Sequence, residues 1–149
     1  MIQPFDDVYF MKKALQEAET GFAKGEIPVG AVIVLNNQII ARAHNLTETL
    51  NDVTAHAEMQ AFTAAADYLG GKYLKECILY VTLEPCQMCA GASYWTQIGK
   101  IVYGASELQR GFLHLKTTLH PKTLVLGGIL ENDCSQILKR FFIEKRNLN

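Results

Sequence analysis

The sequence has no excess of charge of either sign and no long apolar run. Its 149 residues include 14 Lys and Arg against 15 Asp and Glu, a formal net charge of −1. This balance excludes a globally basic nucleic-acid binder but is compatible with a local basic patch. No apolar run approaches the ~18 residues that a membrane helix needs, so we expect no membrane segment. Residues 1–7 lack the basic and apolar regions of a signal peptide, and we expect a cytoplasmic protein.

Cysteine and tryptophan are also scarce, with four residues and one residue. In a chain with no recognisable leader, four cysteines are more consistent with thiols or metal ligands than with disulfides. Hydrophobic residues make up 49% of the chain and charged residues 19%, which argues against disorder. A chain of this length buries roughly 68–70% of its unfolded surface and needs no covalent cross-link. We therefore predict a single domain over residues 1–149.

Helical and strand patterns alternate along the chain. Asp6 or Asp7 is suited to cap the first helix, and Thr54 to cap the second. Pro85 is suited to the first turn of the third helix, because its fixed φ matches that position. Apolar periodicity and these end signals predict four helices, over residues 5–24, 54–69, 85–98 and 132–146.

Short runs rich in β-branched residues mark the predicted strands. They cover residues 29–35, 38–44, 77–83, 100–104 and 123–126. Asn36 and Asn37 form a tight turn that joins the first two strands into a hairpin, whereas residues 105–122 show no clear pattern. Strands joined through helices favour parallel pairing with helices on both faces. The predicted fold class is α/β, a three-layer α/β/α sandwich with a mixed five-stranded sheet.

Two short motifs, His56-Ala57-Glu58 and Pro85-Cys86-Gln87-Met88-Cys89, each open a predicted helix. Cys86 and Cys89 are three residues apart, so they share one helix face and can bind one ion. His56 and Glu58 are two apart, but side chains in a first turn lean back and can both reach a site beyond the helix end. Taken separately, each motif is also compatible with a structural histidine or a redox pair. Together they predict a zinc site.

The ligand set favours catalytic zinc over structural zinc. His56, Cys86 and Cys89 leave a fourth zinc position open, whereas structural sites usually have four protein ligands. Zinc lowers the pKa of bound water to about 7, and Glu58 is the proton carrier that such chemistry needs. The alternative is a structural zinc knuckle completed by one further histidine, which would be His44, His114 or His120.

Both motifs resemble those of the zinc-dependent nucleoside and cytidine deaminase superfamily, in which His-x-Glu with Pro-Cys-x-x-Cys is the signature. The surrounding residues resemble most closely the bacterial tRNA-specific adenosine deaminases. The resemblance runs from about residue 7 to residue 146. It is carried by residues 27–32, Asn45, residues 54–59, 82–92 and 102–105, and the pair Phe141-Phe142.

This resemblance implies a cytidine-deaminase-like fold and a specific reaction. Adenosine at the wobble position of a tRNA anticodon loop becomes inosine, with the base flipped out of its stack. One zinc ion per chain is held by His56, Cys86 and Cys89. Glu58 takes a proton from the attacking water and delivers it to N1 of adenine. The resemblance also implies a homodimer, and the small residues of the 90–93 run are compatible with close approach of a second chain.

The resemblance also directs attention to residues that would contact the substrate. Asn45 matches the family asparagine that hydrogen-bonds the substrate, and the Ala57 N–H at a helix start is a further donor. Glu107 stands where the tRNA enzymes usually have Asp, and Gln109-Arg110 replace their Lys-Thr. Because this stretch lies near the flanking nucleotides in the family, these departures bear on RNA specificity and leave the zinc chemistry untouched.

Two other functions remain open at this point. One is deamination of a free nucleobase or nucleoside, of the guanine or cytosine type, which uses the same metal site. The other is a zinc-stabilised binding module, which would keep its zinc and lose nothing when Glu58 is changed.

The last helix bears on the RNA interpretation, because its basic residues could bind phosphate, although basic residues are favoured near any helix C-terminus. The phosphate-binding candidates are Arg110, Lys139, Arg140, Lys145 and Arg146. The buried face of this helix is expected to contain Ile137, Leu138, Phe141 and Phe142. Cys77 and Cys134 have no motif partner and are expected to be buried structural thiols.

Overall fold

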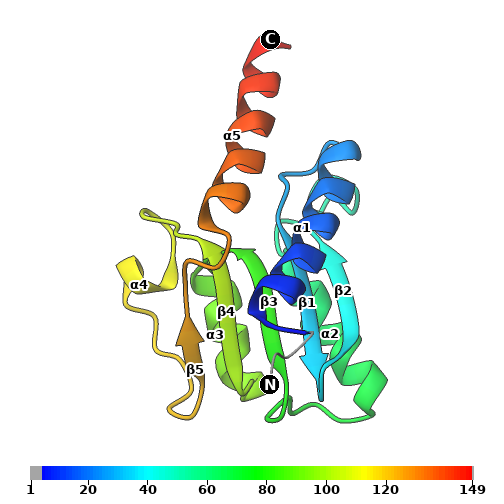
Figure 1. Ribbon diagram of the computed structural model, residues 1–149, viewed down its shortest axis with the longest axis vertical. Helices are drawn as coiled ribbons and strands as arrows, with labels where there is room; N and C mark the ends of the chain where they lie inside the picture. The colour runs from blue at the N-terminus through cyan, green and yellow to red at the C-terminus, as the bar shows by residue number, and fades with distance from the viewer. Residues whose placement is uncertain (1–4, 149) are drawn as a thin grey trace.

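The computed structural model describes residues 5–148. Five strands form one sheet in the order β2-β1-β3-β4-β5 (Figure 1). The strands are β1 Gly30–Leu35, β2 Gln38–His44, β3 Ile78–Leu83, β4 Lys100–Ala105 and β5 Leu124–Leu126. The helices are α1 Asp7–Ala23, α2 Ala57–Leu69, α3 Gln87–Thr96, α4 Phe112–Leu115 and α5 Glu131–Asn147. Across residues 5–148, no helix combines the length and the apolar character needed to cross a membrane.

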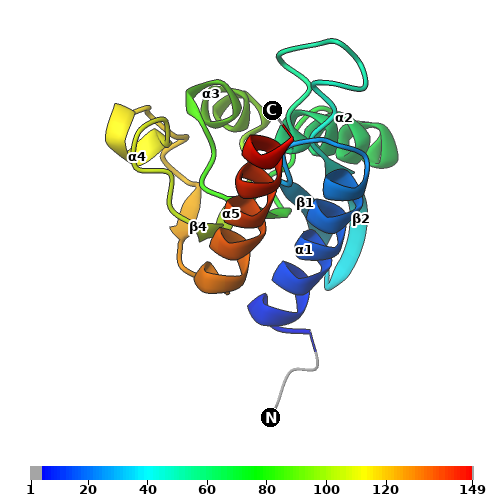
Figure 2. The ribbon, with the colours of Figure 1, turned by 90° about the horizontal axis from the view of Figure 1, so that it is seen from above.

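The sheet is mixed, as predicted. Strand β1 pairs antiparallel with both β2 and β3, whereas the β3–β4 and β4–β5 pairs are parallel. The β1–β2 hairpin turns at Asn36 and Asn37, whose φ angles of 50° and 61° suit a tight two-residue turn. Helices α1 and α5 cover one face of the sheet, and α2 and α3 cover the other (Figure 2). The α/β/α sandwich is therefore confirmed.

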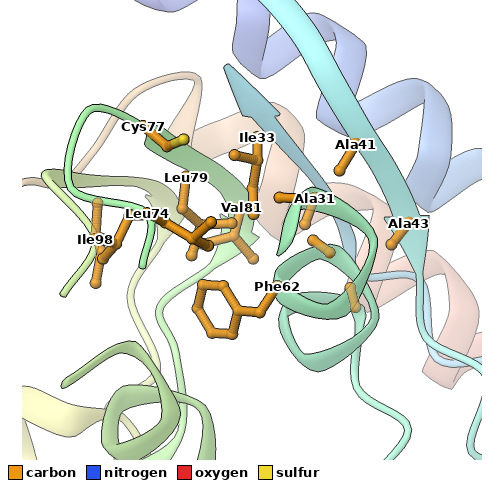
Figure 3. Packing of buried hydrophobic residues seen from close by; sticks show 14 of the residues in the cluster. Ala31, Ile33, Ala41, Ala43, Phe62, Leu74, Cys77, Leu79, Val81 and Ile98 are labelled. Atoms are coloured by element: carbon orange, nitrogen blue, oxygen red, sulfur yellow. The ribbon is translucent and has the colours of Figure 1, made fainter. Parts of the chain in front are cut away.

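Two hydrophobic clusters lie on opposite faces of the sheet. The cluster under α2 and α3 is centred on Ile33, Val81 and Phe62 (Figure 3). The cluster under α1 and α5 includes Val32 and Tyr80. Neighbouring strand residues enter different clusters because side chains alternate across a strand. This double burial makes the central strands a rigid support for the loops that follow them.

Two helices begin later than predicted, and the difference matters for the site. Thr54 does not cap α2, because its N–H and hydroxyl both donate to Asp52 Oδ1 at 2.8 Å. The N-cap residue of α2 is instead His56. Pro85 lies one residue before the N-cap of α3, which is Cys86. Each motif therefore places a candidate metal ligand directly at a helix start.

The C-terminal helix α5 buries less of its surface than predicted. Cys134, Ile137 and Phe141 are buried, but Leu138 is only half-buried and Phe142 is 46% exposed. Figure 1 shows that α5 extends past the end of the sheet, so its second half has no sheet beneath it. The expectation that all four predicted apolar residues face the core is therefore wrong for Phe142.

The two cysteines outside the motifs are core residues, as expected. Cys77 packs in the α2 and α3 cluster, and Cys134 packs in the α1 and α5 cluster. Burial raises the pKa of both thiols, to about 12 for Cys134. Such thiols are poor nucleophiles and poor metal ligands.

Candidate metal centre and active site

Three potential metal ligands converge from two helix starts. His56 and Cys86 are the N-cap residues of α2 and α3, and Cys89 lies in the first turn of α3. His56 Nδ1 is 3.6 Å from Cys86 Sγ and 3.6 Å from Cys89 Sγ. All three ligand atoms lie within 4.8 Å of one another, and the described residues contain no other such group of His, Cys, Asp or Glu.

These distances fit zinc. Tetrahedral zinc with bonds of about 2.3 Å to sulfur and about 2.0–2.1 Å to nitrogen separates its N and S ligands by about 3.6 Å. The group contains one imidazole and two thiols, so a fourth position stays open. His44, His114 and His120 do not belong to it. His44 Nε2 instead lies 3.5 Å from Lys24 Nζ. A knuckle completed by a second histidine is therefore not supported.

The surroundings of the two thiols favour a thiolate. A hydrogen bond from Cys89, with the nearby His56, lowers the pKa of Cys86 to about 4. A hydrogen bond to Cys86 raises the pKa of His56. The positive ends of α2 and α3 add to this effect, because both helices start at the group. A divalent cation that binds this group would replace its shared protons.

Glu58 lies beside the metal ligands but outside their group. It is the second residue of α2 and is only 4% exposed. Burial raises the pKa of Glu58 to about 7. A carboxyl group with such a pKa can both accept and donate a proton near neutral pH.

A cavity of about 360 Å³ opens above these residues. This volume lies within the range of ~300–1,000 Å³ that is typical of small-molecule sites. Six of the seven residues predicted for the site line it, namely Asn45, His56, Ala57, Glu58, Cys86 and Glu107. The seventh, Cys89, is buried. The structure thus brings the predicted residues together in one place.

Asn45 and Ala57 supply polar groups to the cavity wall. Asn45 is buried, and its side chain donates to Ile27 O at 3.5 Å and accepts the Thr47 N–H at 3.3 Å. These bonds hold the amide at the end of β2. Ala57 is the first residue of α2, so its N–H has no acceptor within the helix and can serve a ligand.

Glu107 lines the cavity and also makes hydrogen bonds within its own loop. Its Oε1 accepts the N–H groups of Gln109 at 3.0 Å and Arg110 at 3.3 Å. One carboxylate oxygen thus caps a turn in its own loop. Arg110 also lines the cavity, so the loop presents both a negative and a positive side chain there.

Sequence reasoning missed several lining residues. Leu138 and Phe142 of α5 line the cavity, as does Glu84. The spacing of four places Leu138 and Phe142 on one helix face. The adjacent Phe141-Phe142 pair is plain in the sequence, but helical periodicity alone does not say which ring faces the sheet.

Arg140 differs from the expectation that it stays available for phosphate. Its guanidinium nitrogen lies 2.8 Å from Glu19 Oε2, and its Cζ lies 4.5 Å from the centre of the Phe22 ring. Both partners belong to α1. Arg140 therefore attaches α5 to α1, which removes it from the set of free basic residues.

Comparison with known proteins adds independent evidence. Residues 5–105 match the cytidine and deoxycytidylate deaminase zinc-binding region. The tRNA-specific adenosine deaminase of Bacillus subtilis (strain 168) is 43% identical over 146 residues, which cover 94% of this chain and 91% of the relative. A structure solved in a study of A-to-I editing by tRNA:A34 deaminases is 40% identical, with a TM-score of 0.82. The match covers 87% of this chain and 99% of the other.

A guanine deaminase structure from Bacillus subtilis is also similar, with 45% identity and a TM-score of 0.62, over 65% of this chain and 62% of the other. The adenosine deaminase matches span nearly the full length of both partners, whereas this one spans about two thirds. Zinc is the cofactor of these hydrolases, and the ligand group found here suits it. The chain belongs to the tRNA-specific adenosine deaminase family of zinc-dependent deaminases.

Proposed function

We propose that this chain converts adenosine to inosine at the wobble position of a tRNA anticodon loop. The observation that carries the proposal is the cavity itself. Glu58 and the metal ligands lie in its wall, and the exposed side chains of Arg110 and Phe142 also line it. The cavity therefore connects a catalytic metal site to a surface that a polymer can reach.

In this reaction His56, Cys86 and Cys89 hold the zinc ion. Bound zinc lowers the pKa of water to about 7 and so supplies a nucleophile at neutral pH. Glu58 accepts the proton of the attacking water and delivers it to N1 of adenine. Glu58 then transfers the second proton of that water to the leaving amino group. A C6–O bond forms, the C6–N bond breaks, and ammonia and inosine result.

The remaining cavity residues orient the base. Asn45 and the Ala57 N–H donate hydrogen bonds to it, and Leu138 and Phe142 provide apolar surface. The target base must leave its stack to enter, because C6 is inaccessible inside stacked nucleotides. Glu107 and its loop then lie beside the flanking nucleotides.

We further propose one deaminase domain over residues 1–149, acting as a homodimer in the cytoplasm. The 90–93 run alone does not establish this interface, because Ala90 and Ser93 are buried within their own chain. Near the end of α3, however, Trp95 is 76% exposed and offers apolar surface to a partner. Sedimentation equilibrium should give twice the chain mass of 16.6 kDa.

An inosine assay tests the proposed reaction. The zinc-loaded protein is incubated with an anticodon stem-loop that carries adenosine at the wobble position, beside free bases and nucleosides. We expect inosine at that position alone and no ammonia from the free compounds. Glu58→Gln is the matched control for contaminating activity. Ammonia release from a free base with an unmodified stem-loop would contradict the proposal.

Guanine deamination is the second candidate, favoured by the 45% identity to a guanine deaminase over 65% of this chain. It predicts xanthine from free guanine. It also predicts that changes among the exposed basic residues of α5 leave activity intact, because a free base makes no phosphate contacts.

A further inference from the structure

Glu84 is a buried carboxylate to which the proposed reaction gives no step. It connects the end of β3 to Pro85 and the metal-binding turn, and it is only 3% exposed. Buried carboxylates are rare unless other groups compensate their charge. Among the described residues, the one ion pair joins Arg140 and Glu19, so Glu84 has no cationic partner there.

Backbone N–H groups compensate the negative charge of the Glu84 side chain instead. Glu84 Oε1 accepts the N–H of Glu107 at 3.1 Å, and Oε2 accepts the N–H of Leu113 at 3.0 Å. The backbone N–H of Glu84 donates to Ala105 O at 2.8 Å. One residue therefore holds both ends of the segment 106–113, which we call the rim loop.

The rim loop also docks on the metal-binding turn through its backbone. The Phe112 N–H donates to Pro85 O at 3.0 Å, and Gly111 forms an antiparallel bridge with Cys86. Gly111 lies so close that a Cβ there would overlap Glu84 Oε2. The loop that carries Glu107 into the cavity is thus joined directly to the residue that carries a metal ligand.

The chemistry of this contact requires a carboxylate. Two N–H donors reach the side chain from different points, and a carboxylate offers an acceptor to each. A glutamine can accept only one of them, because its NH₂ group would face the other N–H. Both oxygens of Glu84 are occupied by the loop, which leaves the side chain a geometric role rather than a chemical one.

We propose that Glu84 is a positioning residue that fixes the rim loop, and with it Glu107 and Arg110, at the cavity. The inference rests on the proposed deamination and identifies Glu84 as the residue that positions the rim loop for substrate binding. Loosening the rim loop should weaken substrate binding and leave the chemical step, which depends on Glu58 and zinc, nearly intact.

The test compares Glu84→Gln with wild type on the stem-loop substrate. Because hydrogen bonds to a charged group are the stronger kind, we expect KM to rise about tenfold or more. We expect kcat to change less than about threefold, since Glu84 makes no contact that changes in the transition state. Zinc should stay at one ion per chain. Tyr80→Phe is the matched control, because it loses a 2.7 Å hydrogen bond to Asp7 on the other face of the sheet.

Amide hydrogen exchange supplies a second readout that needs no substrate. The N–H groups of Glu107 and Leu113 should be protected in wild type and in Tyr80→Phe. At least one of them should exchange faster in Glu84→Gln. If Glu84→Gln does not fold, Gly111→Ala perturbs the same contact from the loop side, because its Cβ would meet Glu84 Oε2 and Glu107 O. It should also raise KM, while zinc stays at one ion per chain.

Three outcomes would overturn the inference. An unchanged KM in Glu84→Gln, with the Glu107 and Leu113 amides still protected, would show that this contact does not fix the position of the rim loop. A loss of stability alone, with unchanged kinetics of the folded protein, would reduce Glu84 to a structural role. A fall in kcat at constant KM would show that Glu84 acts on the substrate. If wild type leaves the stem-loop unmodified, the proposed function fails, while amide exchange still tests the link between Glu84 and the rim loop.

Discussion

The metal-binding side of the cavity and its rim are held in place by different means. His56, Glu58, Cys86 and Cys89 lie at the starts of two helices that pack on a sheet buried on both faces. The rim consists of the loop 106–113 together with Leu138 and Phe142 on one side of α5, which extends beyond the sheet. Core packing fixes the first region, whereas a few hydrogen bonds fix the second. We therefore expect catalysis and substrate choice to depend on different parts of the molecule.

A second buried carboxylate, Glu26, has its charge compensated in the same way as Glu84. The fully buried Glu26 accepts the Glu48 N–H at 3.0 Å, the Thr49 N–H at 2.6 Å and the Thr49 hydroxyl at 2.6 Å. Burial on its own raises the pKa of Glu26, but these hydrogen bonds outweigh it and lower the pKa below the usual value. Glu26 and Glu84 are thus both buried carboxylates that accept N–H groups from a loop distant in sequence.

The largest effect should come from removing a metal ligand. Cys86→Ser should lose zinc and bring deamination to background, because two remaining ligands hold zinc poorly. Elemental analysis measures the zinc content, and turnover on the stem-loop measures the deamination. Cys77→Ala removes a buried thiol away from the site and should keep one zinc per chain. A fully metallated, active Cys86→Ser protein would refute the ligand assignment.

The next largest effect concerns proton transfer. Glu58→Gln should keep zinc, because Glu58 lies outside the ligand group. General acid–base catalysis contributes roughly 10²–10⁴-fold, and Glu58 serves several transfers, so kcat should fall by about 10⁴-fold or more. A loss smaller than tenfold would be incompatible with the mechanism. A zinc-stabilised binding module would lose none of its binding in this variant.

The metal-free protein should show the energetic cost of burying Glu58. The pKa of Glu58 in the folded protein is about 7, above the ordinary value of 4.5. Protonated Glu58 therefore leaves the folded state at full stability below pH 4.5, and this stability is lost as the pH rises through about 7 and the buried carboxyl ionises. At about 1.4 kcal/mol per pKa unit, the loss is roughly 3 kcal/mol. With a chelator present, Glu58→Gln should gain stability relative to wild type between pH 4.5 and pH 8. Urea unfolding across this range measures the difference, and parallel pH profiles would contradict it.

The smallest effects should come from the exposed basic residues of α5. Lys145→Ala/Arg146→Ala should weaken stem-loop binding at low salt and reduce the salt slope by about one unit for each phosphate interaction that is removed. Turnover at saturating RNA should stay unchanged, because neither residue lines the cavity.

Arg140→Ala is the matched control for this double variant. Since Arg140 is paired with Glu19 at the surface, its removal should leave the salt slope unchanged and cost at most about 1 kcal/mol of stability. Binding titrations between about 50 and 200 mM salt measure both variants. A stem-loop affinity that does not depend on salt would rule out RNA as the substrate.

Much of this molecule is readable from local sequence. The strand Gln38–His44 has its predicted bounds, and the other strands begin or end within one residue of theirs. The potential ligand group of His56, Cys86 and Cys89, which the structure brings together, could be predicted from the spacing within two motifs, because each motif occupies a single helix start. The caps were predicted less well. Thr54 has a suitable side chain, but Asp52 engages it in a local turn two residues before the N-cap.

The sequence by itself determined the alternation of helices and strands and the place of the potential metal ligands and Glu58 at two helix starts, since each depends on residues a few positions apart. Only the tertiary structure decided how the rim is built. The contacts of Glu84 with Glu107 and Leu113 span 23 and 29 residues, and the pairing of Glu19 with Arg140 spans 121. No local pattern specifies such contacts, because they depend on where separate elements meet after the sheet has formed.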